Sequence, residues 1–145
     1  MRGKTASGSN EVLNFSGNKP GYSYRLVEFQ IYPSAAVGTQ TAELLASVTA
    51  AKTHEDPAYP NFNNEGLIAT ASLSIRSMSG GWQSYANDSI VNDTFLITQD
   101  LILAVVDTEA GSPMDVNWQC RFVAEKMSKS EEAVTNYKQF TISNE

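Results

Sequence analysis

Alternation of apolar and polar side chains is the feature that most constrains how this chain folds, and it is clearest over residues 67–76. Every second position there is apolar, at Leu67, Ala69, Ala71, Leu73 and Ile75. A period of two places these side chains on one face of a β-strand and their neighbours on the other. Similar patterns predict strands over 22–32 and 116–126, so we expect a chain built mainly from strands.

Three other segments complete the predicted elements. Residues 42–51 alternate like a strand, although their alanines also suit a short helix, and we favour the strand. Residues 90–106 hold one long strand or two and become apolar on both faces, as a covered central strand does. A capping box at Ser128 and Glu131 predicts one C-terminal helix over 130–140. Together these elements favour an all-β fold, an antiparallel β-sandwich with a short terminal helix.

The first 21 residues are predicted to form a flexible N-terminal arm. They are rich in Gly, Ser, Asn and Lys, and a Lys-Pro-Gly turn signal ends them. Val12, Leu13 and Phe15 form a short apolar island, which needs a surface on this domain or on a neighbouring subunit. Residues 22–145 are expected to form a single domain, because a chain of 145 residues fits one hydrophobic core.

Charge is distributed unevenly along the chain. The formal net charge is −6, yet residues 1–25 carry four basic side chains and one acidic side chain, which leaves −9 for residues 26–145. We expect such an arm to contact nucleic acid or an acidic neighbour, or to be solvated without a partner. The acidic body does not suit direct binding of phosphates, which takes clustered Lys and Arg.

Side chains with catalytic or metal-binding potential are few. His54 is the only histidine and Cys120 the only cysteine, whereas zinc sites usually use several such ligands. Cys120 alternates with Trp118 and Phe122, which predicts a buried thiol. No nucleophile motif frames a serine, so we expect no catalytic residue, no metal, no cofactor and no enzymatic activity. Calcium at strand ends is a minor alternative, carried by the aspartates at 88, 93, 100, 107 and 115.

Aromatic side chains stand in two predicted loops, over residues 52–66 and 77–88. They are Tyr59, Phe62, Trp82 and Tyr85. Aromatic faces stack on sugar rings, which would make these loops a ligand site. The alternative, which we favour, is that the aromatic side chains anchor the loops, close the ends of the sandwich or fill a subunit contact.

Two stretches of the chain resemble small structural proteins of environmental bacteriophages. They are Asn92 to Leu101 (NDTFLITQDL) and Asn117 to Phe122 (NWQCRF), followed by the predicted helix with Glu132-Ala133-Val134. The strand from Tyr22 to Pro33, with its preceding arm, is similar in style. The resemblance touches half of the chain and implies a virion component with a single jelly-roll or related sandwich fold.

These expectations describe a protein that works through its surfaces. We expect a non-enzymatic virion structural protein, which is a capsid, vertex or surface decoration subunit. It would form a homo-oligomer and contact other virion proteins. The acidic body favours an outer or vertex position, or a shell whose basic arm alone faces inward. The alternative is a carbohydrate-binding β-sandwich module or a viral receptor-binding domain, carried by Tyr59, Trp82 and Tyr85.

The cellular location is inferred from the apolar runs of the chain. The first 25 residues contain no hydrophobic core of a signal peptide. No apolar run approaches the roughly 20 residues of a membrane helix. We therefore expect synthesis in the host cytoplasm, a final location in the virion and no membrane contact.

Overall fold

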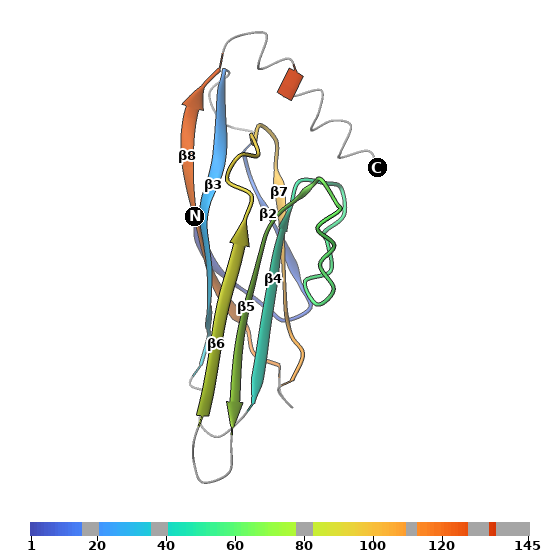
Figure 1. Cartoon of the computed structure of the whole chain (residues 1–145), viewed down its shortest axis with the longest axis vertical. Helices are drawn as coiled ribbons and strands as arrows, with labels where there is room; N and C mark the ends of the chain where they lie inside the picture. Colours follow the sequence, from blue (N-terminus) through green and yellow to red (C-terminus); the bar gives the residue numbers. More distant parts are fainter. Residues whose placement is uncertain (16–20, 36–40, 78–82, 110–112, 128–133, 136–145) are drawn as a thin grey trace.

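The computed structural model is an all-β fold whose strands form two antiparallel sheets (Figure 1). It describes residues 1–15, 21–35, 41–77, 83–109, 113–127 and 134–135. Within these residues the chain forms eight strands, and both sheets combine strands that are distant in the sequence.

The smaller sheet has three strands in the order β1-β8-β3. They are β1 (Arg2–Thr5), β8 (Val116–Lys126) and β3 (Tyr22–Pro33). The larger sheet has five strands in the order β2-β7-β4-β5-β6. They are β2 (Asn10–Leu13), β7 (Leu101–Asp107), β4 (Ala42–Thr49), β5 (Leu67–Ser77) and β6 (Gln83–Val91).

One apolar core lies between the two sheets. Phe29 of β3 and Leu44 of β4 are fully buried in it, although they belong to different sheets. The strands β5 and β7 add further buried side chains, among them Leu73, Leu101 and Leu103. Burial of apolar surface from both sheets holds the two layers together in a sandwich-like arrangement.

The structure confirms the strands that were predicted from alternation. The segments 22–32, 67–76 and 116–126 correspond to β3, β5 and β8. The segment 42–51 contains β4, which is a strand and not a helix. The segment 90–106 contains the end of β6 and all of β7 except its last residue, Asp107. The strand β7 is central, between β2 and β4, and the consecutive residues Leu103, Ala104 and Val105 are all buried, so both of its faces are covered.

A β-bulge changes which side chains of β3 face the core. Alternation alone placed Val27, Phe29 and Ile31 on one face. The register between β3 and β8 shifts between Leu26 and Glu28, so Leu26 is fully buried while Val27 is only half-buried. The bulge inserts one extra residue, so the side chains before it point to the face opposite to the one that simple alternation predicts.

The expectation of a flexible arm is wrong for residues 1–15. The strand β1 pairs with β8 in one sheet, and β2 pairs with β7 in the other. Gly8, whose φ of 80° lies in the left-handed region, helps the chain turn between them. Leu13 and Phe15 are buried in the core of this domain, and only Val12 is exposed. Leu13 and Phe15 thus complete the core of the domain itself.

One further expectation is wrong in part, and another falls almost entirely outside the described residues. The strand β6 begins at Gln83, so the second half of the segment expected to be a loop over 77–88 is a strand. The helix predicted over 130–140 falls outside the described residues except at 134–135. It therefore stays a prediction.

Candidate functional site

The strand β6 contributes almost nothing to the core. It pairs with β5 in one unbroken antiparallel register, from Ala69 opposite Val91 to Ser77 opposite Gln83. The side chains of residues 84–90 are all exposed, including those of Tyr85 (65%) and Ile90 (54%). Among the described residues no strand pairs with its other side. We refer to the side of β6 that faces away from β5, over residues 84–90, as the β6 edge.

The other edges of the two sheets are better protected than the β6 edge. The strands β1 and β2 have four residues each. The strand β3 is bulged and charged, and Tyr24 exchanges two main-chain hydrogen bonds with Ile97 across its edge (2.9 and 2.7 Å). The strand β6 has nine residues, no bulge, no Lys, Arg or Pro, and one charge at Asp88. Bulges, charges and cover are the devices that keep edge strands from pairing, and β6 has the fewest.

A loop over residues 51–66 follows β4 and carries part of the exposed apolar surface. Glu55 is its centre, because its carbonyl accepts a hydrogen bond from the hydroxyl of buried Ser47 (2.7 Å) and its N–H donates to the hydroxyl of buried Thr49 (3.1 Å). The carboxylate of Glu55 also accepts from the N–H of Asn61 (3.1 Å) and the side-chain amide of Asn64 (2.7 Å). These bonds hold the loop, which carries Tyr59 and Phe62, against β4.

The structure does not bring the four predicted aromatic residues into one site. Tyr59 and Phe62 are exposed, so the expectation that they anchor the loop on the core is wrong. Phe62 lies beside Ile90, which is opposite Thr70 on the outer face of the sheet. Tyr85 is opposite buried Ile75 and therefore belongs to the other face of β6. Trp82 lies outside the described residues.

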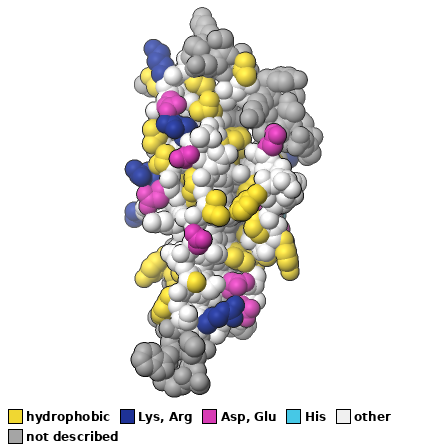
Figure 2. All heavy atoms as spheres, viewed as in Figure 1, with side chains coloured by type: hydrophobic (Ala, Val, Ile, Leu, Met, Phe, Trp, Pro, Cys, Tyr) yellow, Lys and Arg dark blue, Asp and Glu magenta, His cyan; other side chains and the backbone are white. Residues whose placement is uncertain are grey.

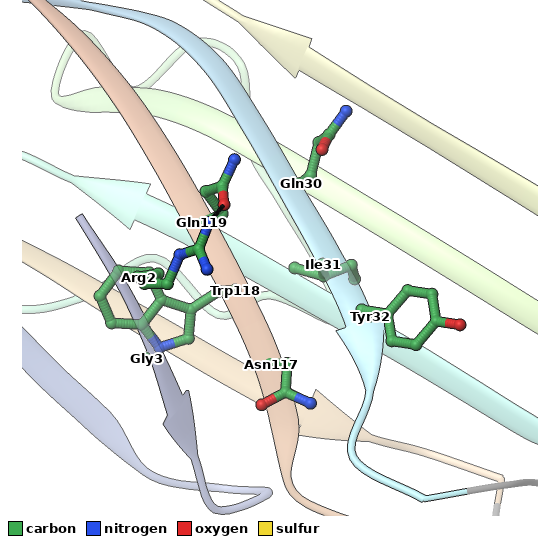
Figure 3. Close-up of a pocket in the computed structure, with 8 residues that line it drawn as sticks. All are labelled: Arg2, Gly3, Gln30, Ile31, Tyr32, Asn117, Trp118 and Gln119. Carbon is green, nitrogen blue, oxygen red and sulfur yellow. Dashed lines mark hydrogen bonds between the residues drawn. The ribbon is translucent and has the colours of Figure 1, made fainter.

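An open groove of about 460 Å³ lies on the three-stranded sheet (Figure 3). Its lining residues come from β1, β8 and β3 and are Arg2, Gly3, Gln30, Ile31, Tyr32, Asn117, Trp118 and Gln119. A guanidinium nitrogen of Arg2 donates to the side-chain carbonyl of Gln119 (2.6 Å). The ring of Tyr32 is 72% exposed and points away from this pair.

Sequence reasoning missed this groove for a physical reason. The register places Gln119 opposite Arg2 on one side and opposite Gln30 on the other. These three residues are far apart in the chain, and nothing in their local sequence marks them as neighbours. The only signal was the outward position of the polar side chains on each predicted strand.

Basic side chains concentrate on the three-stranded sheet. The described residues include seven Lys and Arg, and five of them lie on its strands, at Arg2, Lys4, Arg25, Arg121 and Lys126. Arg25 forms an ion pair with Glu125, and Arg121 forms one with Glu28 (3.2 Å). Figure 2 shows basic and acidic side chains side by side at the upper left of the molecule, where Figure 1 places β3 and β8. Basic side chains are thus divided unevenly between the two sheets, as they are between residues 1–25 and the rest of the sequence.

The reactive side chains of the described residues have structural surroundings. His54 is exposed, and its Nδ1 lies 2.7 Å from the side-chain nitrogen of Asn10. Cys120 is buried, and burial raises the pKa of its thiol from 9.0 to about 12. The buried carboxylate of Asp107 accepts hydrogen bonds from the N–H groups of Glu109 and Met114 (both 3.2 Å), which holds a turn.

The described residues show neither a metal-binding cluster nor a membrane-spanning helix, and two comparisons with known proteins give no match. Within the described ranges no group of three or more His, Cys, Asp or Glu is placed to hold a metal ion. The same part of the chain contains no helix of the length and apolar character that a membrane crossing requires. No protein-family model matches the chain, and no curated protein matches it significantly. Its function is therefore inferred from its own geometry and chemistry.

Proposed function

We propose that this protein is a non-enzymatic structural subunit of a virion, acting as a capsid, vertex or surface decoration protein by assembling with copies of itself. The observation that carries the proposal is the β6 edge, a nine-residue strand with exposed side chains on both faces and one paired side. A strand so exposed gains stability from a further partner, because main-chain groups on its outer side and exposed apolar side chains are then covered.

The order of the strands supports a jelly-roll fold. In a jelly roll the eighth strand lies between the first and third, and the other sheet contains the second, seventh, fourth and fifth strands in that order. The orders β1-β8-β3 and β2-β7-β4-β5 agree with this scheme. The strand β6 departs from it, because it pairs with β5 and only lies near β3. Viral capsid proteins and lectins both use jelly rolls, so the fold alone does not choose between them.

The exposed apolar side chains favour assembly through more than one surface. Tyr85 and Ile90 lie on β6, Phe62 lies on the loop beside Ile90, and Tyr32 lies on the three-stranded sheet. A closed shell or ring needs contacts on several sides of each subunit, and such a distribution provides them.

The basic three-stranded sheet suggests how the subunit is oriented. Arg2 and Lys4 extend from β1 on a molecule whose net charge is −6. We infer that this sheet faces nucleic acid or an acidic neighbour, and that the acidic remainder faces outward. The protein would be made in the host cytoplasm and reach its final place in the virion.

The experiment that tests the proposal is size-exclusion chromatography with light scattering, followed by electron microscopy of the eluted particles. The proposal predicts an oligomer with a mass that is a multiple of 15.8 kDa. A protein that stays monomeric at every concentration would contradict it.

The alternative function is carbohydrate binding, and the groove of Figure 3 is the observation that favours it. Tyr32 offers an exposed ring, and Gln30, Asn117 and Gln119 offer amide groups that suit sugar hydroxyls. The site differs from the one expected from Tyr59, Trp82 and Tyr85. A glycan array with Tyr32→Ala and the matched control Tyr59→Ala tests it, since only the first change should abolish binding.

A further inference from the structure

We propose that the β6 edge pairs antiparallel with the β6 edge of a second copy, in a register in which Asn87 lies opposite Asn87 of the partner subunit. The two five-stranded sheets then become one continuous sheet across a two-fold axis. This inference rests on the proposed function and names the partner and the contact that assembly would use.

The length and regularity of β6 suit this partner. An added strand needs an unbroken row of main-chain donors and acceptors, and β6 has no bulge over its nine residues. A second copy supplies a strand of the same length and the same regularity. Two-fold symmetry also closes the contact, so the outer edges of both β6 strands are covered at once.

Charge and length select the register. Two identical antiparallel strands meet at a residue that lies opposite itself, and the central candidates are Ala86, Asn87 and Asp88. A centre at Asp88 sets two carboxylates directly opposite each other, which is destabilising. A centre at Ala86 leaves the last residues of β6 without an opposite residue. A centre at Asn87 pairs the whole strand from Gln83 to Val91.

Side-chain size agrees with the same register. Tyr85 lies opposite the partner's Ser89, and Ile90 lies opposite the partner's Ser84, so each large side chain meets a small one. The side-chain amide of Asn87 has both donors and an acceptor and can pair with its own copy. The strand is therefore complementary to itself in shape as well as in hydrogen bonding.

The surface beside the β6 edge adds apolar area to the contact. Phe62 and Ile90 line one small cavity on the outer face of the five-stranded sheet, and both side chains are more than half exposed. The partner's residues around Ser84 would cover Ile90 and the neighbouring ring of Phe62. Burial of these side chains favours a second copy over a short extended peptide, which would cover the edge alone.

Cross-linking of single-cysteine variants of the full chain tests the register. Asn87→Cys places two thiols opposite each other at the axis, whereas the native Cys120 is buried and does not compete. A short bifunctional thiol linker should give at least about tenfold more covalent dimer for Asn87→Cys than for Val12→Cys, because proximity raises the effective concentration. Val12 is the matched control, since it is exposed on the opposite edge strand of the same sheet.

A second pair of variants checks the register without altering Asn87. A mixture of Ser84→Cys and Ile90→Cys should link far more than either variant alone, because these positions face each other only in the proposed register. This mixture decides the matter if circular dichroism shows that Asn87→Cys is misfolded.

The outcomes separate the inference from the function on which it rests. Strong linking at 87 and in the 84/90 mixture supports the inference. Linking at 87 no stronger than at 12, in a protein that light scattering shows to be oligomeric, overturns the β6 pairing and leaves assembly standing. A chain that is monomeric at every concentration overturns both.

Discussion

Gly3 of β1 and Trp118 of β8 lie directly opposite each other, and a Cβ atom added at Gly3 would stand 2.7 Å from Cζ2 of the indole ring. The ring is nearly buried, and its Nε1 donates a hydrogen bond to the hydroxyl of Thr5 (3.0 Å). The indole therefore packs against the backbone of β1 at Gly3 and bonds to Thr5 of the same strand, which attaches this short strand to the sheet. The absence of a side chain at Gly3 is what lets it do so.

Gly3→Ala should lower the free energy of unfolding by about 1–3 kcal/mol, because the added methyl group forces the indole of Trp118 to move. Urea unfolding followed by circular dichroism at a fixed protein concentration measures this change. Lys4→Ala is the matched control, since it alters the neighbouring exposed side chain on the same strand. Equal stability of Gly3→Ala and the native protein would show that β1 is not held as described.

Phe15→Ala should destabilise the domain by about 3–5 kcal/mol, as loss of a buried aromatic ring does. The ring packs against Tyr24 and Phe122, with centroids 5.3 and 5.0 Å away. Val12→Ala, which removes an exposed side chain three residues earlier, should leave thermal unfolding nearly unchanged. The reverse result, with weaker assembly and unchanged stability for Phe15→Ala, would restore the idea of an assembly arm.

Asp107→Ala should lower the free energy of unfolding by about 1–3 kcal/mol, because partly buried N–H groups lose their acceptor. Its carboxylate accepts hydrogen bonds from the N–H groups of Glu109 and Met114. Amide hydrogen exchange should become faster at both positions, because their acceptor is removed. Asp93→Ala serves as a control, since Asp93 is exposed. Unchanged exchange at Glu109 and Met114 would argue against this role.

Cys120 should resist alkylation in the native protein at pH 8 and react quickly once the protein is unfolded in urea. Burial raises the pKa of this thiol from 9.0 to about 12, and the nearby N-terminal ammonium group lowers it only in part. The thiol stays protonated in the folded state while the unfolded thiol ionises. Its contribution to stability is thus complete below pH 9 and is lost as the pH rises through 12.

Comparison with Cys120→Ala isolates that effect from other groups that titrate in alkali. The native protein should lose more unfolding free energy than the variant between pH 9 and pH 12. Parallel pH curves for the two proteins, or rapid alkylation of the native thiol, would contradict burial of Cys120.

The strands with strong side-chain alternation could be predicted from the sequence, and the weakly patterned ones could not. Leu67 to Ile75 and Val116 to Cys120 bury every second side chain, so the core itself imposes their period. The strand β6 has no buried face, so hydrophobicity gives it no pattern, and its hydrogen bonds with β5 define it. The strand β1 also shows no hydrophobic pattern in the sequence, because it is short and polar.

The candidate surfaces were the harder part to predict. Phe62 and Tyr85 are both exposed aromatic residues, but the alternation of β6 and its pairing with β5 place Tyr85 on the face away from Phe62. Gln30, Gln119 and Arg2 line one groove only because β8 lies between β1 and β3. The order of the strands in a sheet determines which distant residues become neighbours. The local sequence shows no pattern that predicts this order.

Sedimentation velocity of the native chain beside two lysine variants tests most directly whether this protein assembles through the β6 edge. We predict that the native chain sediments as a multiple of 15.8 kDa and that Val12→Lys does the same. Asn87→Lys should shift the distribution toward the monomer, because two like charges would then meet at the axis. A native chain that sediments at 15.8 kDa across the whole concentration range would contradict the account.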